Sequence, residues 1–207
     1  MPTSLLRRAL LVLTTAAVAW APPLFGQWRV GAEVGASRFW GGSLVTSGDS
    51  TSLRPYRPTT FGLSLERQSG RYAAGLHLHY AEASLALEGP DGVISAPGAF
   101  TIVSISPELA VRIATLGPGN QLRIHAGPLI EFWDIIDQEG RTRVGAQGSL
   151  SLDVPLGGRF TGVVLAGAAV TPSPYKEGEL DLGAGFPTYD LRTLWRRSFA
   201  VGVRYRL

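Results

Sequence analysis

Apolar and polar side chains alternate with a period of two over eight stretches of the chain, beginning at Trp28. This alternation indicates β-strands that have one apolar and one polar face. The stretches cover residues 28–40, 59–68, 71–81, 99–113, 121–133, 142–156, 159–170 and about 190–207. None of them has the ~18 continuous apolar residues that a membrane-spanning helix needs. The pattern predicts an all-β chain of eight strands.

The connections between these stretches alternate in length. Tight turns are expected at 69–70, 115–120 and 157–158, and longer loops at 41–58, 84–98, 134–141 and 171–189. In an antiparallel up-and-down arrangement, all tight turns lie at one end and all long loops at the other. Outer-membrane barrels have this arrangement. We expect a single domain over residues 27–207.

The first 26 residues have the composition of a secretory signal peptide. Arg7 and Arg8 precede the apolar run "ALLVLTTAAVAWA", and "PPLFGQ" follows it. This order of charged, apolar and small residues is typical of signal peptides, and the run is too short to span a membrane. We expect cleavage, with the junction between Gly26 and Gln27 favoured, and export of the mature chain.

Alternation alone fits both a lipocalin-like carrier with an apolar interior and a membrane barrel with an apolar exterior. The polar face is rich in glycine, alanine and serine, which suit the narrow lumen of an eight-stranded barrel. Aromatic residues near strand ends on the apolar face suit a membrane–water interface. They are Trp28, Tyr72, Tyr80, Phe132, Trp195 and Tyr205. We therefore predict an eight-stranded antiparallel up-and-down transmembrane β-barrel, whose closure leaves no unpaired edge.

Composition excludes several functional classes. The chain has no cysteine, so it has no disulfide framework and no thiolate metal site. The net charge is +3, but the basic residues are scattered along the strands and Lys176 is the only lysine. A nucleic-acid-binding protein would instead gather them in a patch. We expect no cofactor, no nucleic-acid partner and a monomeric chain.

Charged and histidine side chains gather in one zone of the predicted polar face. The expected lumen network is Glu33, Glu66, Glu108, Asp153, Arg112, Arg123, Arg204, His77 and His125, with Arg206 at a neighbouring height. Guanidinium groups can satisfy several carboxylates at once in a confined space. We expect this network to fill the barrel, because eight strands leave room mainly for side chains and not for a conducting pore.

Two sharper interpretations involve the histidines. His77 and His79 share one face of a strand and His125 could lie across the lumen, a pattern that can bind a metal. We expect no metal site, because neighbouring arginines would repel a cation. His79 with Glu82 and Ser84 loosely resembles a catalytic base, acid and nucleophile. This combination keeps a lipid A-modifying enzyme as the alternative function, and no catalytic residue is assigned.

The long loops offer a different kind of contact. The stretch "SLRPYRP" places Arg54, Tyr56 and Arg57 where phosphate groups of lipopolysaccharide or a partner could meet them. Arginine binds phosphate through charge-assisted hydrogen bonds, and tyrosine supports it by cation–π contact. We expect external-loop contacts here.

The stretch "RIHAGPLIEFW" (123–133) and the overall pattern resemble the small outer-membrane β-barrel families, which include the OmpA and OmpX transmembrane domains. The resemblance implies a location in the outer membrane, contact with its lipid and lipopolysaccharide, and a structural or surface-interaction role without catalysis. It also implies that the barrel-assembly machinery recognises the last strand, where an aromatic final residue is preferred. The corresponding residues are Phe199, Val201, Val203, Tyr205 and Leu207.

Overall fold

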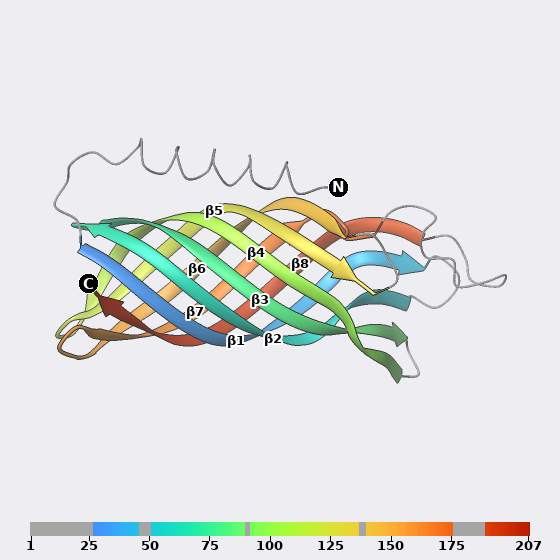
Figure 1. Cartoon of the computed structure of the whole chain (residues 1–207), viewed down its shortest axis with the longest axis horizontal. Helices are drawn as coiled ribbons and strands as arrows, with labels where there is room; N and C mark the ends of the chain where they lie inside the picture. Colours follow the sequence, from blue (N-terminus) through green and yellow to red (C-terminus); the bar gives the residue numbers. More distant parts are fainter. Residues whose placement is uncertain (1–26, 46–50, 90–91, 137–139, 176–188) are drawn as a thin grey trace.

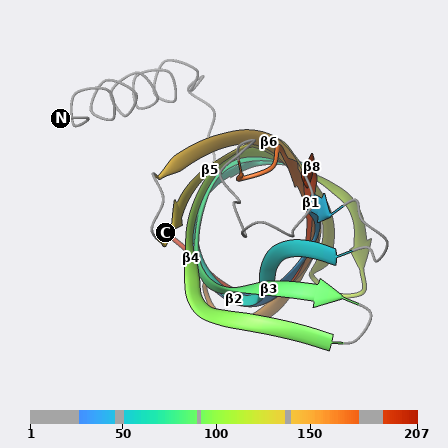
Figure 2. The ribbon, with the colours of Figure 1, turned by 90° about the vertical axis from the view of Figure 1, so that its right-hand side faces the viewer.

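The computed structural model describes residues 27–45, 51–89, 92–136, 140–175 and 189–207, and the expected signal peptide lies outside this part. The described residues form eight strands: β1 (Gln27–Val45), β2 (Thr51–Ser69), β3 (Tyr72–Gly89), β4 (Gly92–Leu116), β5 (Asn120–Ile135), β6 (Arg141–Gly157), β7 (Phe160–Thr171) and β8 (Tyr189–Arg206). Each strand pairs antiparallel with the next, and β8 pairs with β1 (Figures 1 and 2). The predicted fold class is confirmed. No helix within the described part is long and apolar enough to cross a membrane.

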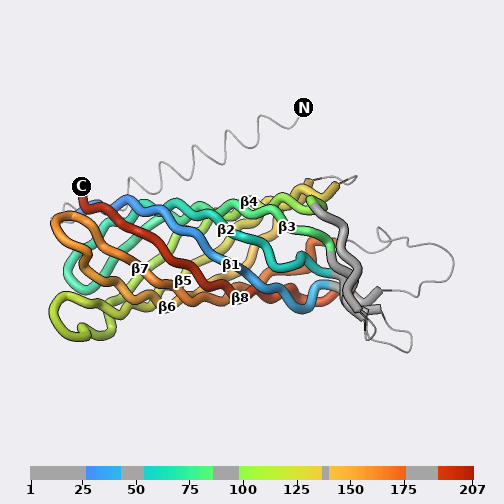
Figure 3. Tube along the Cα trace, turned by 90° about the horizontal axis from the view of Figure 1, so that it is seen from below, coloured from blue at the N-terminus to red at the C-terminus, as the bar shows by residue number. Residues whose placement is uncertain are grey.

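The two ends of the barrel differ in the way that the loop lengths predict. Tight turns at residues 70–71, 117–119 and 158–159 lie at the same end as the start of β1 and the end of β8 (Figures 1 and 3). The strand ends that lead into the longer connections lie at the opposite end. We call these the turn end and the loop end.

The apolar face of the strands points outward. Leu63 and Leu109, for example, are 63% and 69% exposed, whereas Glu66 and Arg123 are each only 2% exposed. A lipocalin-like carrier requires the opposite arrangement, with apolar side chains inside and polar ones outside. An exterior of this kind is stable only in an apolar solvent, so the barrel has the surface of a membrane protein.

The six aromatic residues predicted for the membrane interface all lie on outward-facing positions. Tyr72 follows the first tight turn, and Tyr205 packs against Phe160 beside the third, with 5.1 Å between ring centroids. Trp28 is the second residue of β1, at the same end. The other three lie farther from the turn end: Tyr80 in the middle of β3, and Phe132 and Trp195 near the loop end of β5 and β8. The apolar band lies between these two groups.

The hairpins at the loop end are longer than predicted, so the expected loops at 41–58 and 84–98 were wrong. β1 and β2 continue to Val45 and from Thr51, and the β3–β4 hairpin reaches Gly89 and Gly92. Beyond the apolar band neither face of a strand has to meet lipid, so alternation is not required there. The register is also irregular in these segments, for example between Ala36 and Ser43, which further breaks the period.

An arginine placed in the middle of the apolar band should destabilise the barrel. Leu76 lies midway between Tyr72 and Tyr80 on β3 and is 41% exposed. We expect Leu76→Arg to lower the free energy of unfolding by about 2–4 kcal/mol, and Leu116→Arg, beside a tight turn, by about 0–1 kcal/mol. Urea unfolding in phospholipid vesicles, followed by the heat-modifiable gel band, measures both. Equal small losses would contradict a lipid-facing exterior.

Candidate functional site: the charged lumen

Most of the described inward-facing charges form three groups at different heights. The arginine layer, nearest the turn end, comprises Arg29, Glu66, Arg123, Asp153 and Arg204. The histidine layer comprises Glu33, His77, His79, Glu108 and His125. The upper pair, nearest the loop end, is Glu131 and Arg196.

The arginine layer holds two carboxylates among three guanidinium groups. Arg123 places Nη1 2.7 Å from Glu66 Oε1 and Nε 3.4 Å from Asp153 Oδ2. Arg204 places Nη1 3.2 Å from Asp153 Oδ1 and 3.8 Å from Glu66 Oε2. Arg29 completes the layer, with Nη1 3.5 Å from Asp153 Oδ2 and 3.9 Å from Glu66 Oε1. Each carboxylate is therefore shared by all three arginines.

These contacts connect distant parts of the chain. The five side chains come from β1, β2, β5, β6 and β8, so one network links strands on several sides of the lumen. Glu66, Arg123, Asp153 and Arg204 are each 2% exposed. Charges buried this deeply are stable only when paired, so the network fixes the strand register as well as filling the lumen.

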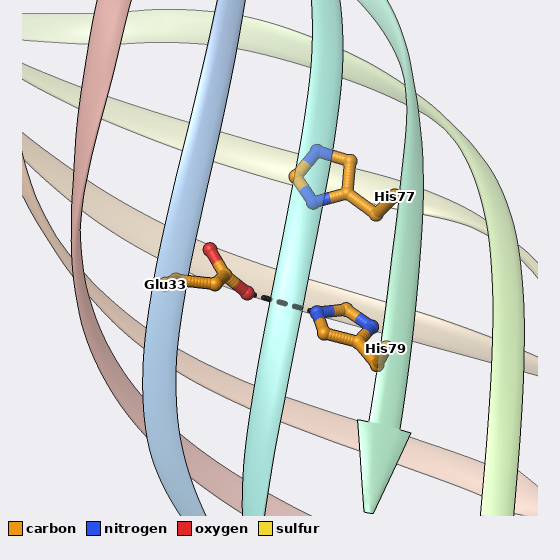
Figure 4. Close-up of side chains that lie close together, drawn as sticks. All are labelled: Glu33, His77 and His79. Carbon is orange, nitrogen blue, oxygen red and sulfur yellow. Dashed lines mark hydrogen bonds and ion pairs between the residues drawn. The ribbon is translucent and has the colours of Figure 1, made fainter.

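One half of the histidine layer is a hydrogen-bonded pair. His79 Nε2 lies 2.8 Å from Glu33 Oε1, across the neighbouring strand β2 (Figure 4). Gly62 of β2 lies between them. A Cβ at this position would be 2.6 Å from Glu33 Cγ and 2.8 Å from His79 Cδ2. Glycine is therefore needed here to leave room for the pair.

The other half of the layer surrounds Glu108. His77 Nε2 and His125 Nδ1 each lie 3.5 Å from Glu108 Oε2. Glu108 Oε1 accepts a hydrogen bond from Gln147 Nε2. Gly127 lets β5 approach β4 beside these residues, because a Cβ there would lie 3.1 Å from Glu108 Cα and 2.0 Å from a backbone oxygen.

Ser151, His125 and Glu108 contact one another in the sequence serine, histidine, carboxylate, as the catalytic triad of a serine hydrolase does. His125 Nε2 lies 2.9 Å from Ser151 Oγ, while its Nδ1 faces the carboxylate of Glu108. A serine hydrolase orders its nucleophile, base and acid in this way. However, Ser151 is fully buried, and its hydroxyl donates to Asp153 Oδ1 at 3.3 Å. The arrangement therefore links the histidine layer to the arginine layer and presents no nucleophile to a substrate.

The combination predicted for the enzyme alternative is not assembled. His79 points into the lumen, whereas Glu82 is exposed on the opposite face of β3 and accepts a hydrogen bond from the Tyr80 hydroxyl. Residues an odd number apart on a regular strand point to opposite faces, which is why these two separate.

Both residues of the upper pair contact aromatic side chains. Arg196 Nη1 lies 2.9 Å from Glu131 Oε1, and Trp133 Nε1 donates to Glu131 Oε2 at 3.1 Å. The Arg196 guanidinium also lies 5.9 Å from the centre of the Phe39 ring. Trp133 and Phe39 belong to a buried apolar cluster, whose other members include Phe100, Ile102, Tyr175 and Leu194.

Residues 172–175, directly after β7, turn into this cluster at the loop end. Arg141 Nη1 donates to the Pro174 carbonyl at 2.5 Å, and Arg143 Nε donates to the Ser173 carbonyl at 2.6 Å. Tyr175 is 3% exposed, and burial raises the pKa of its phenol. Apolar and aromatic side chains therefore close the described part of the lumen above the upper pair.

A small cavity remains between the histidine layer and the upper pair. Its volume is ≈ 50 Å³, and its lining includes Glu33, His77, His79, Glu108 and Arg196. One water needs roughly 10–15 Å³ of such volume, so the cavity holds only a few waters.

The lumen residues predicted from the sequence have different positions. The structure joins Glu66, Asp153, Arg123 and Arg204 directly, and it places Glu33, Glu108, His77 and His125 one layer nearer the loop end. Arg112 lies beside an irregularity in β4 close to a tight turn and forms no ion pair with a described carboxylate. Arg206 is exposed at the turn end. Height within the barrel separates residues that share the inward face.

Sequence reasoning missed Arg29, Glu131 and Arg196 as network members. Each occupies an inward-facing position of its strand, so the same period-two pattern could have identified them. The predicted contacts Arg54, Tyr56 and Arg57 lie on β2 and not in a loop. The residues proposed as the assembly signal lie in or beside β8, which pairs with β1, and their recognition by the assembly machinery stays a prediction.

Solved structures with the same fold are outer-membrane barrels. Neisserial surface protein A has a TM-score of 0.56 and 11% identity, covering 87% of this chain and 97% of its own. OprG from Pseudomonas aeruginosa has a TM-score of 0.56 and 11% identity, covering 88% and 96%. A major outer membrane protein from Thermus thermophilus has a TM-score of 0.50 and 14% identity, covering 87% and 99%.

No protein-family model and no curated protein sequence matches the chain. The likeness to the solved structures is therefore one of fold. The resemblance inferred from the sequence is confirmed at this level. The chain has the fold of small eight-stranded outer-membrane barrels, together with the exposed apolar band that such a location requires.

Removing one carboxylate from the arginine layer should destabilise the barrel. Asp153→Asn keeps the shape of the side chain but leaves Arg29 and the two buried arginines, Arg123 and Arg204, with Glu66 alone. We expect a loss of about 3–5 kcal/mol in the free energy of unfolding. Asp134→Asn, at an exposed position of β5, is the matched control and should change it little. Urea unfolding in detergent measures both, and equal effects would contradict the role assigned to the layer.

Proposed function

We propose that the protein is an integral outer-membrane barrel without catalytic activity that acts at its loop end by binding the phosphate groups of lipopolysaccharide. The observation that carries this proposal is the outer arginine patch, a group of outward or rim-facing arginines on β1, β2 and β8. Its members are Arg38, Arg54, Arg57 and Arg197.

The patch lies at the loop-end margin of the apolar band, where Trp195 also lies. On β8, the exposed Phe199 is followed toward the loop end by Arg197 on the same face. On β1, Val34 and Ala36 are followed by Arg38, which is the register partner of Arg197. Phosphate groups of the outer leaflet lie at this boundary between hydrocarbon and water.

Aromatic side chains hold the guanidinium groups. Arg197 lies 4.7 Å from the centre of the Trp40 ring, which stacks on Trp195 at 6.3 Å. Arg57 lies 5.2 Å from the centre of the Tyr56 ring. Stacking uses the flat face of guanidinium and leaves its N–H groups free to bind phosphate oxygens.

The charge of the patch favours an anionic partner. Among the described acidic residues, none forms an ion pair with Arg38, Arg57 or Arg197. Arg54 lies within electrostatic range of Arg38 and Arg57. A bound phosphate would reduce the repulsion between these cations and form short charge-assisted hydrogen bonds.

The closed lumen supports a role at the surface and not through the barrel. The arginine layer fills the turn end, and the aromatic cluster fills the loop end. The hydroxyl of Ser151 is buried, so the triad-like order at His125 supplies no accessible nucleophile.

Removing the patch should weaken binding to lipopolysaccharide. The test compares the triple variant Arg38→Gln, Arg57→Gln, Arg197→Gln with a matched triple variant at the turn end, Arg71→Gln, Arg159→Gln, Arg206→Gln. We expect the first to bind at least about tenfold more weakly, since charge-assisted bonds are lost, and the second to be unchanged. Titration in detergent with intrinsic tryptophan fluorescence measures the affinity. Equal loss in both variants would refute a specific patch.

The same samples test the absence of catalysis. After incubation, mass spectrometry of lipid A should show an unchanged acyl pattern. Gain or loss of an acyl chain would support the enzyme alternative instead.

A further inference from the structure

We infer that the histidine layer is a binding site for one divalent first-row transition-metal ion such as Zn²⁺. The ligands are His77 Nε2, Glu108 Oε2 and His125 Nδ1. This site is independent of the lipopolysaccharide patch, and it revises the expectation that arginines in the lumen would repel a cation.

The distances within this triad fit an ion better than direct hydrogen bonds. Both imidazole nitrogens lie 3.5 Å from Glu108 Oε2, and one ligand atom from each residue lies within 4.8 Å of the other two. N–H···O hydrogen bonds span about 2.7–3.2 Å. Ligands of a tetrahedral ion with bonds of about 2.0–2.1 Å are about 3.3 Å apart, close to the observed separations.

Two of the three ligands also form a hydrogen bond with a second residue, which orients them. His125 directs Nε2 to Ser151 Oγ at 2.9 Å, which fixes the ring with Nδ1 facing Glu108. The other oxygen of Glu108 accepts from Gln147 Nε2. His77 lies beside Glu33 and His79, with one ligand atom of each of the three residues within 4.8 Å of the other two (Figure 4). Protein metal sites use such outer contacts to orient their ligands.

The four arginines of the arginine layer and the upper pair form ion pairs with other carboxylates. Those of the arginine layer pair with Glu66 and Asp153, and Arg196 pairs with Glu131. Among the described residues, no arginine forms an ion pair with Glu33 or Glu108. The side chain of Glu108 is only 5% exposed, so its charge is costly unless a cation or a protonated imidazole compensates it. A divalent ion supplies that charge without protonating its ligands.

The donor set and the space around it define the class of ion. Two imidazoles and one carboxylate suit zinc and its neighbours, whereas calcium and magnesium prefer oxygen ligands alone. His77 and Glu108 line the ≈ 50 Å³ cavity, which can hold a water as fourth ligand. The three ligands come from β3, β4 and β5, so the ion would cross-link neighbouring strands as a structural site.

Glu33 and His79 form a second cluster with His77, but we do not assign the ion to it. Glu33 Oε1 and His79 Nε2 are 2.8 Å apart, a direct hydrogen bond that leaves no space for an ion between them. His79 is therefore a matched control, because it is a histidine of the same strand, face and layer.

The experiment measures metal bound to the folded barrel. The wild-type chain and three variants, His77→Gln, His125→Gln and His79→Gln, are refolded in detergent with excess Zn²⁺ and freed of unbound ion. Heat-modifiable migration confirms that each has folded. Elemental analysis should find about one zinc per chain in the wild type and in His79→Gln. His77→Gln and His125→Gln should retain at least about tenfold less.

A second measurement covers the case in which a ligand variant does not fold. Wild-type protein refolded with Co²⁺ should show the intense visible absorption of a tetrahedral site. Ser151→Ala, which changes no ligand, should weaken Co²⁺ binding about 10–100-fold. Wild-type protein without bound metal would overturn the proposal and indicate charge compensation by protonation. Equal loss in His79→Gln and His77→Gln would overturn the assignment of ligands.

Discussion

Each strand of this barrel must expose one face to lipid while its other face enters a lumen too narrow to hydrate its charges. The first condition places Leu63 and Leu109 outside, and the second forces every buried charge to find a partner on another strand. Glu66 of β2 reaches Arg123 of β5, and Asp153 of β6 reaches Arg204 of β8. A slip of one residue in any of these strands would bury apolar side chains among charges and expose charges to lipid. The paired lumen therefore specifies the register that the apolar exterior alone would leave less well defined.

The three charge groups have different compositions and therefore different physical properties. In the arginine layer, three guanidinium groups contact two carboxylates directly, and the layer fills the turn end of the lumen. The histidine layer contains two carboxylates and three imidazoles, whose charge depends on what they bind. Ser151 connects the two layers, because it contacts both His125 and Asp153. Arginine suits permanent pairing, whereas histidine can accept either a proton or a metal ion.

The sequence predicted the faces of the strands well but not the contacts across the lumen. Period-two alternation identifies an inward residue, yet it carries no information on how far each strand is staggered around a tilted barrel. Arg112 and Arg204 were both placed inside, but only Arg204 is at the height of Asp153, and Arg29 was left out although its face was evident. The expected loops at 41–58 and 84–98 were wrong for a related reason: strands that extend beyond lipid lose the alternation by which they are recognised.

The same side chain, arginine, has two distinct uses in this fold, and its neighbours decide between them. Inside, Arg123 contacts two carboxylates and is 2% exposed, so its charge is neutralised within the protein. Outside, Arg197 is stacked on Trp40 and has no described acidic partner, so its charge is available to the phosphate group that we propose it binds. Both uses favour guanidinium over ammonium, because a planar group can stack and still donate several hydrogen bonds. This accounts for a chain in which Lys176 is the only lysine, and it explains why a positive net charge did not indicate a nucleic-acid surface.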